Sequence, residues 1–389
     1  MIKKYNGYYD VSLQLLKTRD QNNFPPQFFI SCTTYDERGA GKTFSTADLL
    51  LQNYFEKGKK LEKIIDHPDY KARSGQFILF TRRIGDLGDI AKGVLDATVA
   101  EHYSDYTVEE VLGKGDKTSR IDLVHYEEFI PYDKDGNPKD PEQEKITETI
   151  GYVIPLNIKM DYFKRTGNRF YNIDCFYFDE FQPEDGSYLP DEIGCFVRIY
   201  ETIARGKGEV ERYIPVILTS NTVAVNNPYF KYTGLSRNIQ SNTRFYRGDG
   251  VVYERPTVTG LAEKRKNSYL HRSLARYFKE TGDNTFINDD GSLVEHPDKW
   301  GRGLYLAALK VGPRVYGLYE YPQKRLFYVS HSIDPNNKYV YSLYIDNHQK
   351  NTPLLKTSPL LRDIRDHIYE GRLRVADQQI QNDLLDYFS

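Results

Sequence analysis

The sequence predicts an α/β fold in which helices cover both faces of a central sheet, followed by a smaller α/β domain. Three observations support this prediction. The apolar run Phe28–Ile30 is followed by a glycine-rich loop and a helical pattern. Two further apolar strands, 173–178 and 213–218, end in polar residues, as strands of an open α/β sheet do. After residue 298 the pattern changes to short strands separated by turns.

Composition and charge indicate a soluble globular protein. The chain has 389 residues, enough for about two domains, and is 39% hydrophobic and 28% charged. Its three cysteines are far apart in sequence, which argues against a disulfide framework or a zinc site. The N-terminus lacks a signal-peptide core, and no run approaches the roughly 20 apolar residues of a membrane span. We therefore expect an intracellular protein without membrane contact. Because the net charge is only −2, any DNA contact requires locally concentrated basic residues.

The glycine-rich segment Asp36–Thr43 has the sequence of a phosphate-binding loop, except that an aspartate replaces the first glycine of the usual pattern. Gly39 and Gly41 permit backbone conformations that residues with a Cβ disfavour, so successive N–H groups can point at an anion. A helix expected from Phe44 to Glu56 would direct the positive end of its dipole at the same anion. The alternative is a chance glycine-rich turn, but the strand before it and the helix after it favour the functional interpretation.

Residues of this loop and of the following helix start are the expected nucleotide contacts. Lys42 would bring a positive charge to the outer phosphates, and the Thr43 hydroxyl suits Mg²⁺ as a ligand. The full set of expected nucleotide-binding residues is Glu37, Arg38, Gly39, Ala40, Gly41, Lys42, Thr43 and Phe44.

Two adjacent acids, Asp179 and Glu180, follow the second apolar strand. Because side chains alternate across a strand, buried Phe and Tyr residues would hold these acids at its end. We expect Asp179 to hold Mg²⁺ through water and Glu180 to orient and activate the attacking water. A helix start with acidic first-turn residues has the same appearance, but the phosphate-binding loop upstream favours the catalytic interpretation.

The third apolar strand ends in Thr219, Ser220 and Asn221, any of which could hydrogen-bond the γ-phosphate or the attacking water. The alternative is an ordinary turn at a strand end. A helix expected from Glu192 to Ala204 ends in a basic turn that begins with Arg205. An arginine on such a turn can reach a neighbouring subunit's site, although it can also be a solvated helix end.

Apolar periodicity and turn signals predict the other elements. In the first domain we expect a helix near 11–16, a strand at 76–81 followed by two arginines, a helix at 84–102, strands at 120–125 and 148–156, and an insertion at 131–141. Further on we expect a basic helix at 259–281, an antiparallel meander at 303–311, 314–321 and 324–332, and helices at 360–369 and 376–388. The expected domains are 1–245, 246–297 (a helical linker) and 298–389.

The three motifs, in this order, resemble the large terminase ATPases of tailed phages. The small size and the strand-rich C-terminal part are most similar to the DNA encapsidation protein of small short-tailed phages. The similarity covers roughly residues 25–225 by motif and rests on layout beyond them. It implies an ASCE-type P-loop ATPase with Walker A and Walker B motifs, which uses ATP and Mg²⁺ to translocate double-stranded DNA into a procapsid.

The resemblance also implies roles for particular residues. Arg38 would act on the γ-phosphate within its own subunit, and Thr219–Asn221 occupy the position of the motif that couples hydrolysis to movement, with Asn221 as a catalytic residue. The family's motors are pentameric rings in which a neighbour supplies an arginine. Arg205 is the first candidate for that arginine and Arg212 the second.

Partners and location follow from the same resemblance. They are double-stranded DNA contacted through its backbone, the portal or connector of the procapsid, a structural packaging RNA in part of the family, and other copies of the chain. Basic side chains at 57–63 and 264–272 are the candidate DNA contacts. The expected location is the host cytoplasm, at the portal vertex, and not the mature virion.

The second domain of large terminases is an RNase H-like nuclease with clustered acids on two metals. Here the strands at 304–309 and 315–319 carry no aspartate, and Asp334, Asp346 and Asp377 lie in turns or polar stretches. Since a two-metal site needs acids converging on ions about 4 Å apart, we expect an RNase H-like domain without nuclease activity. The alternatives are a helicase-type P-loop ATPase, a packaging ATPase with an active metal-dependent nuclease, and a scaffold that binds ATP structurally.

Overall fold

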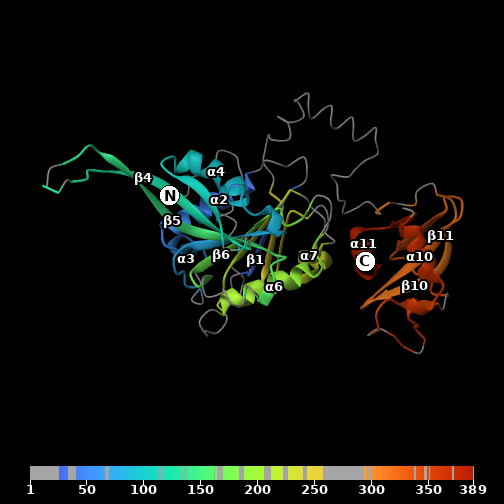
Figure 1. Cartoon of the computed structure of the whole chain (residues 1–389). Helices are drawn as coiled ribbons and strands as arrows, with labels where there is room; N and C mark the ends of the chain where they lie inside the picture. Colours follow the sequence, from blue (N-terminus) through green and yellow to red (C-terminus); the bar gives the residue numbers. More distant parts are fainter. Residues whose placement is uncertain are drawn as a thin grey trace, which may run out of the picture. The chain divides into compact units, whose positions relative to one another are not determined.

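The structure, a computed structural model, divides into two units: Met1–Val223 with Arg244–Asn288, and Ala224–Thr243 with Asp289–Ser389 (Figure 1). It describes residues 26–388 except 34–40, 66–69, 114, 116, 133, 136–137, 162, 164–169, 184–187, 206–211, 222–226, 240–242, 257–292, 296, 298–299, 337–338, 346–347, 350 and 370–371. The helices predicted near 11–16 and at 259–281 therefore lie outside the described residues.

The first unit is built on a nine-stranded sheet of order β3-β4-β5-β2-β6-β7-β1-β9-β8 in its described part. The six strands from β5 to β9 in this order are parallel, and antiparallel strands complete both ends. The strands are β1 (Phe28–Cys32), β2 (Gln76–Thr81), β3 (Thr107–Leu112), β4 (Ser119–Phe129), β5 (Glu142–Pro155), β6 (Ile173–Asp179), β7 (Val216–Ser220), β8 (Phe245–Gly248) and β9 (Val251–Glu254).

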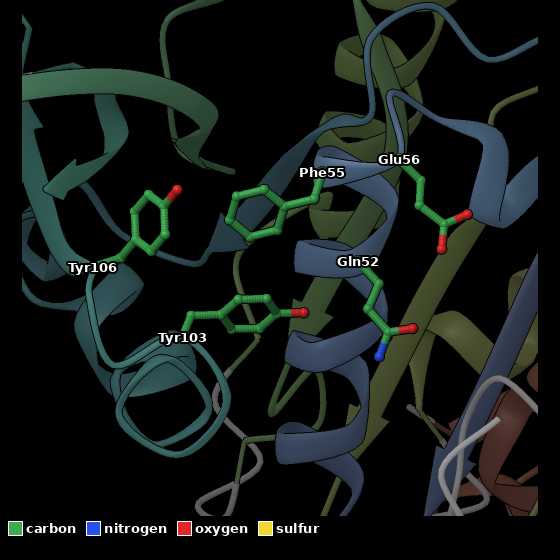
Figure 2. A pocket seen from close by; sticks show the side chains of 5 residues that line it. All are labelled: Gln52, Phe55, Glu56, Tyr103 and Tyr106. Carbon is green, nitrogen blue, oxygen red and sulfur yellow. The ribbon is translucent and has the colours of Figure 1, made fainter. Parts of the chain in front are cut away.

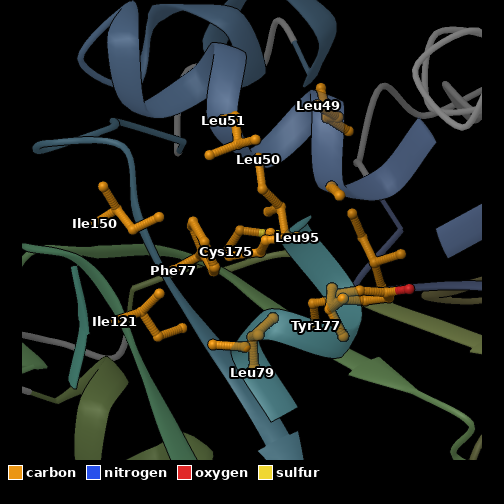
Figure 3. Close-up of a cluster of buried hydrophobic side chains, with 14 of the residues drawn as sticks. Leu49, Leu50, Leu51, Phe77, Leu79, Leu95, Ile121, Ile150, Cys175 and Tyr177 are labelled. Atoms are coloured by element: carbon orange, nitrogen blue, oxygen red, sulfur yellow. The ribbon is translucent and has the colours of Figure 1, made fainter. Parts of the chain in front are cut away.

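Helices cover both faces of this sheet, as predicted, because the buried strands carry apolar residues on both sides. On one face, α2 (Lys42–Phe55), α3 (Lys59–Ile65) and α4 (Ile90–His102) bury Phe77, Leu79 and Tyr177 in one cluster (Figure 3). On the other face, α6 (Glu192–Ala204) packs against the alternate residues: the Phe80 and Phe196 rings are 5.1 Å apart. The sheet is therefore a rigid platform whose strand ends are held in place from both sides.

Three strands whose ends carry polar residues are neighbours in the middle of the sheet. β7 lies between β1 and β6, with Cys32 paired to Ser220 and Asp179 paired to Thr219. Because the three strands are parallel, their carboxyl ends meet at one edge, which is where open α/β sheets bind ligands. This arrangement brings the three sequence motifs to one place.

Most predicted elements of the first unit lie within a few residues of the observed ones, but β3 and α3 were not predicted, and there are three further differences. The helix expected at 84–102 begins as a 3₁₀ turn, Ile84–Asp86, and continues as α4 only after Gly88. β8 and β9 complete the sheet, so it extends past the boundary expected at 245. The insertion expected at 131–141 is the end of a long β4–β5 hairpin, whose strands reach further than the predicted 120–125 and 148–156.

The second unit contains a five-stranded mixed sheet of order β13-β10-β11-β12-β14 in its described part. Its antiparallel meander is the one predicted, since the turns at Gly312 and Pro322 separate complementary apolar strands. The elements are α7 (Pro228–Tyr232), β10 (Leu304–Val311), β11 (Arg314–Tyr321), β12 (Leu326–Ser330), β13 (Val340–Ser342), α10 (Leu360–Tyr369), β14 (Leu373–Val375) and α11 (Gln378–Phe388), with 3₁₀ turns at Leu235–Arg237 and Leu355–Thr357. The Asn382 amide donates to the Ser236 carbonyl, which ties the segment before β8 to α11.

Of the helices described in the two units, none has the length and apolar character needed to cross a membrane.

Candidate nucleotide-binding site

The start of α2 forms one wall of the candidate site. Gly41 precedes the helix with φ 91°, a left-handed conformation that glycine adopts without strain. Its carbonyl accepts the N–H of Ser45 at 2.8 Å, so the helix starts directly after the glycine-rich loop. The N–H groups and dipole of such a helix start favour a bound anion. Four of the predicted nucleotide contacts, Glu37 to Ala40, lie outside the described residues.

The Lys42 ammonium lies between two strand ends. Its side chain is buried, and its Nζ donates to Thr33 Oγ1 at 2.7 Å and to Asn221 Oδ1 at 2.9 Å. Thr33 follows β1 and Asn221 follows β7, so the position of the ammonium depends on the pairing of these two strands. The charge is thereby held at the strand edge, beside the helix start.

The Thr43 hydroxyl and the Asp179 carboxylate meet next to this lysine. Thr43 Oγ1 donates to Asp179 Oδ2 at 2.9 Å, while Thr219 Oγ1 donates to the other carboxylate oxygen at 2.5 Å. Two neighbouring ligands of an octahedral Mg²⁺, each roughly 2.0–2.1 Å from the ion, lie about 2.9 Å apart. At this separation both oxygen atoms could bind Mg²⁺ directly, whereas the sequence predicted that Asp179 would act through a water.

The Glu180 carboxylate at this edge has a raised pKa. Burial raises its pKa first, and the Asp179 charge raises it further. The Asn221 N–H donates to Glu180 Oε2 at 3.1 Å, and its side-chain amide donates to Oε1. Asn221 thus joins Lys42 to Glu180, with its carbonyl oxygen toward the cation and its NH₂ toward the carboxylate.

The backbone at Glu180 is held in an uncommon conformation by Arg82. Glu180 has φ 50°, a conformation that costs a non-glycine residue on the order of 1–3 kcal/mol and persists only where the surroundings enforce it. Arg82 Nη1 donates to the Glu180 carbonyl at 3.2 Å, its Nη2 donates to the next carbonyl, and its Nε pairs with Glu192 at 3.1 Å. Arg82 is therefore a positioning residue for the catalytic candidate.

Other residues singled out in the sequence lie elsewhere. The Phe44 ring packs edge-on to His102, with centroids 5.4 Å apart. Arg205 ends α6 with its side chain 59% exposed and is 3.6 Å from Glu201. Arg212 is bound inside its own unit to Asp174 and to the carbonyl of Ile173, where β6 begins. Because Arg212 is enclosed in this way, it does not suit a role in a neighbouring subunit.

The structure adds two residues that the sequence did not indicate: Thr33 accepts from the lysine, and Tyr177 donates to Thr219 at 2.9 Å. It also gives a role to Arg82, one of the two arginines expected after the strand at 76–81, which holds the loop after Asp179. Burial raises the pKa of Tyr177 well above its usual range, so its hydroxyl stays a neutral donor. The available signal was position: Thr33 and Arg82 each directly follow a buried parallel strand.

Known proteins are similar to this chain in sequence and in fold. The DNA packaging protein of Bacillus phage PZA is 27% identical over 239 residues, which cover 60% of this chain and 69% of the relative. That of Bacillus phage phi29 is 26% identical over the same length and coverage. A chain in the solved structure "The bacteriophage Phi-29 viral genome packaging motor assembly" has a TM-score of 0.54 and 20% identity over 98% of both chains, which shows the fold.

A family model also matches this chain. Residues 144–388 match the family described as "Podovirus DNA encapsidation protein (Gp16)", a segment that contains Asp179, Glu180 and Asn221. The match covers more than half of the 389 residues. The resemblance inferred from the motifs is confirmed: this chain belongs to the family of Podovirus DNA encapsidation proteins (Gp16).

Proposed function

We propose that this chain is an ATP-driven motor subunit that translocates double-stranded DNA into a procapsid. One observation carries the proposal: Lys42 and Thr43, Asp179 and Glu180, and Asn221, from three separate motifs, converge at the carboxyl edge of β1, β6 and β7. A cation, a metal-binding oxygen pair and an acid of raised pKa are the groups that phosphoryl transfer to water requires.

Nucleotide binding would use the start of α2. The N–H groups of the loop and helix start surround the phosphates, and the Lys42 ammonium moves from its hydrogen bonds with Thr33 and Asn221 to the outer phosphates. Thr43 and Asp179 would hold Mg²⁺, which neutralises charge on the β- and γ-phosphates. Arg38, predicted to act on the γ-phosphate, would add a second cation from the loop.

Hydrolysis would depend on Glu180 as the base that orients and deprotonates the attacking water. Its carboxylate is bound by Asn221, whose carbonyl oxygen accepts from Lys42 and from Thr33. When the γ-phosphate draws Lys42 away, Asn221 would lose one of its three partners, and the Glu180 carboxylate would become able to turn to a water. The end of β7 would in this way sense the phosphate and transmit its loss.

The pH dependence of hydrolysis follows from the raised pKa of Glu180. A general base acts only when ionised, so kcat/KM, which reports the ionisation of the free enzyme, should fall as the pH decreases. The midpoint of this fall should lie above 4.5, the ordinary pKa of a glutamate. Asn221 lowers this pKa through its hydrogen bonds, so in Asn221→Ala the midpoint should move to higher pH. A pH series of initial rates with saturating Mg²⁺ measures both; a midpoint that moves to lower pH would contradict the assignment.

The assembly that we propose is a homo-oligomeric ring, pentameric by resemblance, at the portal vertex of a procapsid in the host cytoplasm. The similar phi29 chain was solved within a viral genome packaging motor assembly, which supports such an arrangement. Within the ring, Arg205 would reach a neighbour's triphosphate, since its side chain is exposed at the end of α6. Backbone contacts to DNA would come from exposed basic side chains, because phosphate contacts carry no sequence information. A packaging RNA is a further proposed partner.

The second unit is proposed to lack nuclease activity. Its buried acid Asp383 is occupied by Arg314 at 3.0 Å and by the Tyr316 hydroxyl at 2.6 Å, and Asp377 pairs with His331 at 2.5 Å. Among the described residues, no three His, Cys, Asp or Glu side chains gather closely enough to hold a metal ion. These acids serve packing and helix starts, which supports a unit that transmits movement.

An ATPase assay with and without duplex DNA and procapsids tests the proposed function. We expect Mg²⁺-dependent hydrolysis that duplex DNA and procapsids stimulate, and protection of DNA from nuclease only when procapsids and ATP are both present. Hydrolysis coupled to strand separation of a forked duplex, without such protection, would instead identify a helicase. ATP binding with no turnover in any of these conditions would identify a structural nucleotide.

A further inference from the structure

The β4–β5 hairpin forms an arm that extends beyond the sheet (Figure 1). β3 pairs with β4 only as far as Val124, and β2 pairs with β5 from Gly151 onward. In the described part of the sheet, residues 125–129 and 142–146 therefore have only each other as strand partners. At about 3.3 Å per residue, Phe129 lies roughly 17 Å past Val124. A two-stranded ribbon is only marginally stable on its own in water, so we expect this one to bind a partner.

One face of the arm combines an aromatic ring with three carboxylates. Glu127 lies directly opposite Glu144, and Phe129 lies directly opposite Glu142. Phe129 is 40% exposed and the Glu127 side chain is 67% exposed. Like charges directly opposite each other destabilise a strand pair, and no covering layer offsets this cost in a bare ribbon. Such a face is suited to a partner with positive charge around an apolar site, and it repels the phosphates of a nucleic acid.

The same unit also carries a surface pocket of about 230 Å³, which could serve as the apolar site of such a partner if the partner is a second copy of the chain (Figure 2). It is lined by Gln52, Phe55, Glu56, Tyr103 and Tyr106. The rings of Phe55 and Tyr103 are stacked with centroids 5.0 Å apart, and Phe55 is 37% exposed. The volume is below the roughly 300–1,000 Å³ of small-molecule sites, so it suits one aromatic side chain better than a cofactor.

The positive part of the same surface follows the pocket directly in sequence. Lys57 lies in the turn between α2 and α3, just after the pocket residue Glu56, and Lys59, Lys60 and Lys63 follow in α3. Lys57 and Lys59 are exposed, and Lys63 pairs with Glu56 at 3.2 Å, which neutralises the acid at the rim. This turn is about 20 Å from the nucleotide site, since the 14 residues of α2 separate them. The lysines are therefore too far away to contact the triphosphate.

The arm and the pocket of one subunit cannot meet each other. The pocket residue Tyr106 contacts His125, at the root of the arm, with ring centroids 4.8 Å apart. The pocket thus lies beside the base of its own arm, while Phe129 is four strand residues further out, roughly 13 Å away. Two different patches on one chain, complementary to each other, produce a head-to-tail contact, which closes into a ring when the rotation between copies closes and otherwise forms an open filament.

We propose that the Glu127–Phe129–Glu144 face of the arm docks on the Phe55–Tyr103 pocket and the Lys57–Lys63 turn of a second copy of this chain. Phe129 enters the aromatic pocket, and the arm carboxylates pair with the lysines around it. The proposal rests on the homo-oligomeric ring proposed above and assigns its subunit contact. It also reassigns the lysines of residues 57–63 from DNA to a neighbouring subunit.

Charge reversal on the full chain tests this contact. The variant Glu127→Lys/Glu144→Lys should associate at least about tenfold more weakly than the parent chain in sedimentation velocity, because lysine would then face lysine. Lys57→Glu/Lys59→Glu should show the same loss. All four substitutions together should restore association. The matched control is Glu128→Lys/Gln143→Lys, which adds two lysines at opposed positions on the other face of the same ribbon and should associate normally.

Each other outcome overturns the proposal. These include a parent chain that stays monomeric at high concentration, reversal variants that associate normally, a loss that the fourfold variant does not restore, and a loss of procapsid or DNA binding with unchanged self-association. Binding of a fluorescent ATP analogue provides the separate readout. It should be unchanged in every arm variant, since the arm is remote from Lys42. If the charge-reversal variants give the expected changes in association while neither they nor the parent chain bind ATP, the subunit contact is supported and the proposed function is wrong.

Discussion

A Glu180→Gln variant should bind ATP as tightly as the parent chain and hydrolyse it about 10²–10⁴ times more slowly. The amide keeps the shape of the side chain and can still hydrogen-bond Asn221, so the site should stay assembled. What it lacks is an ionisable oxygen to take the proton of the attacking water. Single-turnover hydrolysis and equilibrium binding of ATP, measured on the same preparation, separate the two effects.

Glu101→Gln is a suitable control for this experiment, because Glu101 is an exposed acid of α4 outside the site. Its turnover should equal that of the parent chain. If Glu180→Gln turns over normally, the base is another group, and the raised pKa of Glu180 would have a purely structural origin. If the variant also loses ATP binding, Glu180 would instead have to contact the nucleotide or its metal directly.

Lys42→Ala should reduce hydrolysis by at least about a hundredfold, since it removes a cation that stabilises charge developing on the phosphates. It should also weaken ATP binding, unlike the substitution at Glu180. The buried ammonium lowers the pKa of Glu180, so any remaining activity should have its acid limb at still higher pH. Rates over a range of ATP concentrations and pH values measure all three effects.

Lys92→Ala, an exposed lysine of α4, is the matched control and should behave like the parent chain. Wild-type turnover in Lys42→Ala would rule out the candidate site as a whole.

The same variant tests Arg205 in mixed oligomers, because a Lys42→Ala subunit still offers its Arg205 to a neighbour that carries Arg205→Ala and an intact loop. Recovered hydrolysis in the mixture supports a role of Arg205 in trans, and hydrolysis no greater than that of the separate variants excludes it.

The parts of the fold that sequence predicted best are those where local pattern and burial agree. β2 and β6 have apolar cores, Phe77–Phe80 and Cys175–Phe178, because both faces of the sheet are covered, and their bounds match the predicted strands. α6 spans the predicted residues Glu192–Ala204, since its apolar periodicity fits one buried face. The family resemblance, based on three short motifs, is confirmed by the family match over residues 144–388.

The elements that sequence missed depend on strand pairing and not on an apolar pattern of their own. Half of the residues of β3 are polar and the strand is largely exposed, and it exists because its hairpin partner β4 offers it hydrogen bonds. β8 and β9 are short and join the sheet through β1, more than 200 positions earlier. The outer halves of β4 and β5 carry charged or other polar residues at most positions, so no apolar alternation reveals them.

Sequence alone determined which chemical groups this protein has and at which strand ends they lie, because an apolar run followed by a polar residue can be recognised from the local sequence. Tertiary structure alone decided how these groups are joined. The order β6-β7-β1 places Asn221 between Lys42 and Glu180, and the packing of β2 beside β6 brings Arg82 under the Glu180 backbone. Strand order depends on long-range pairing and burial, which no single segment encodes.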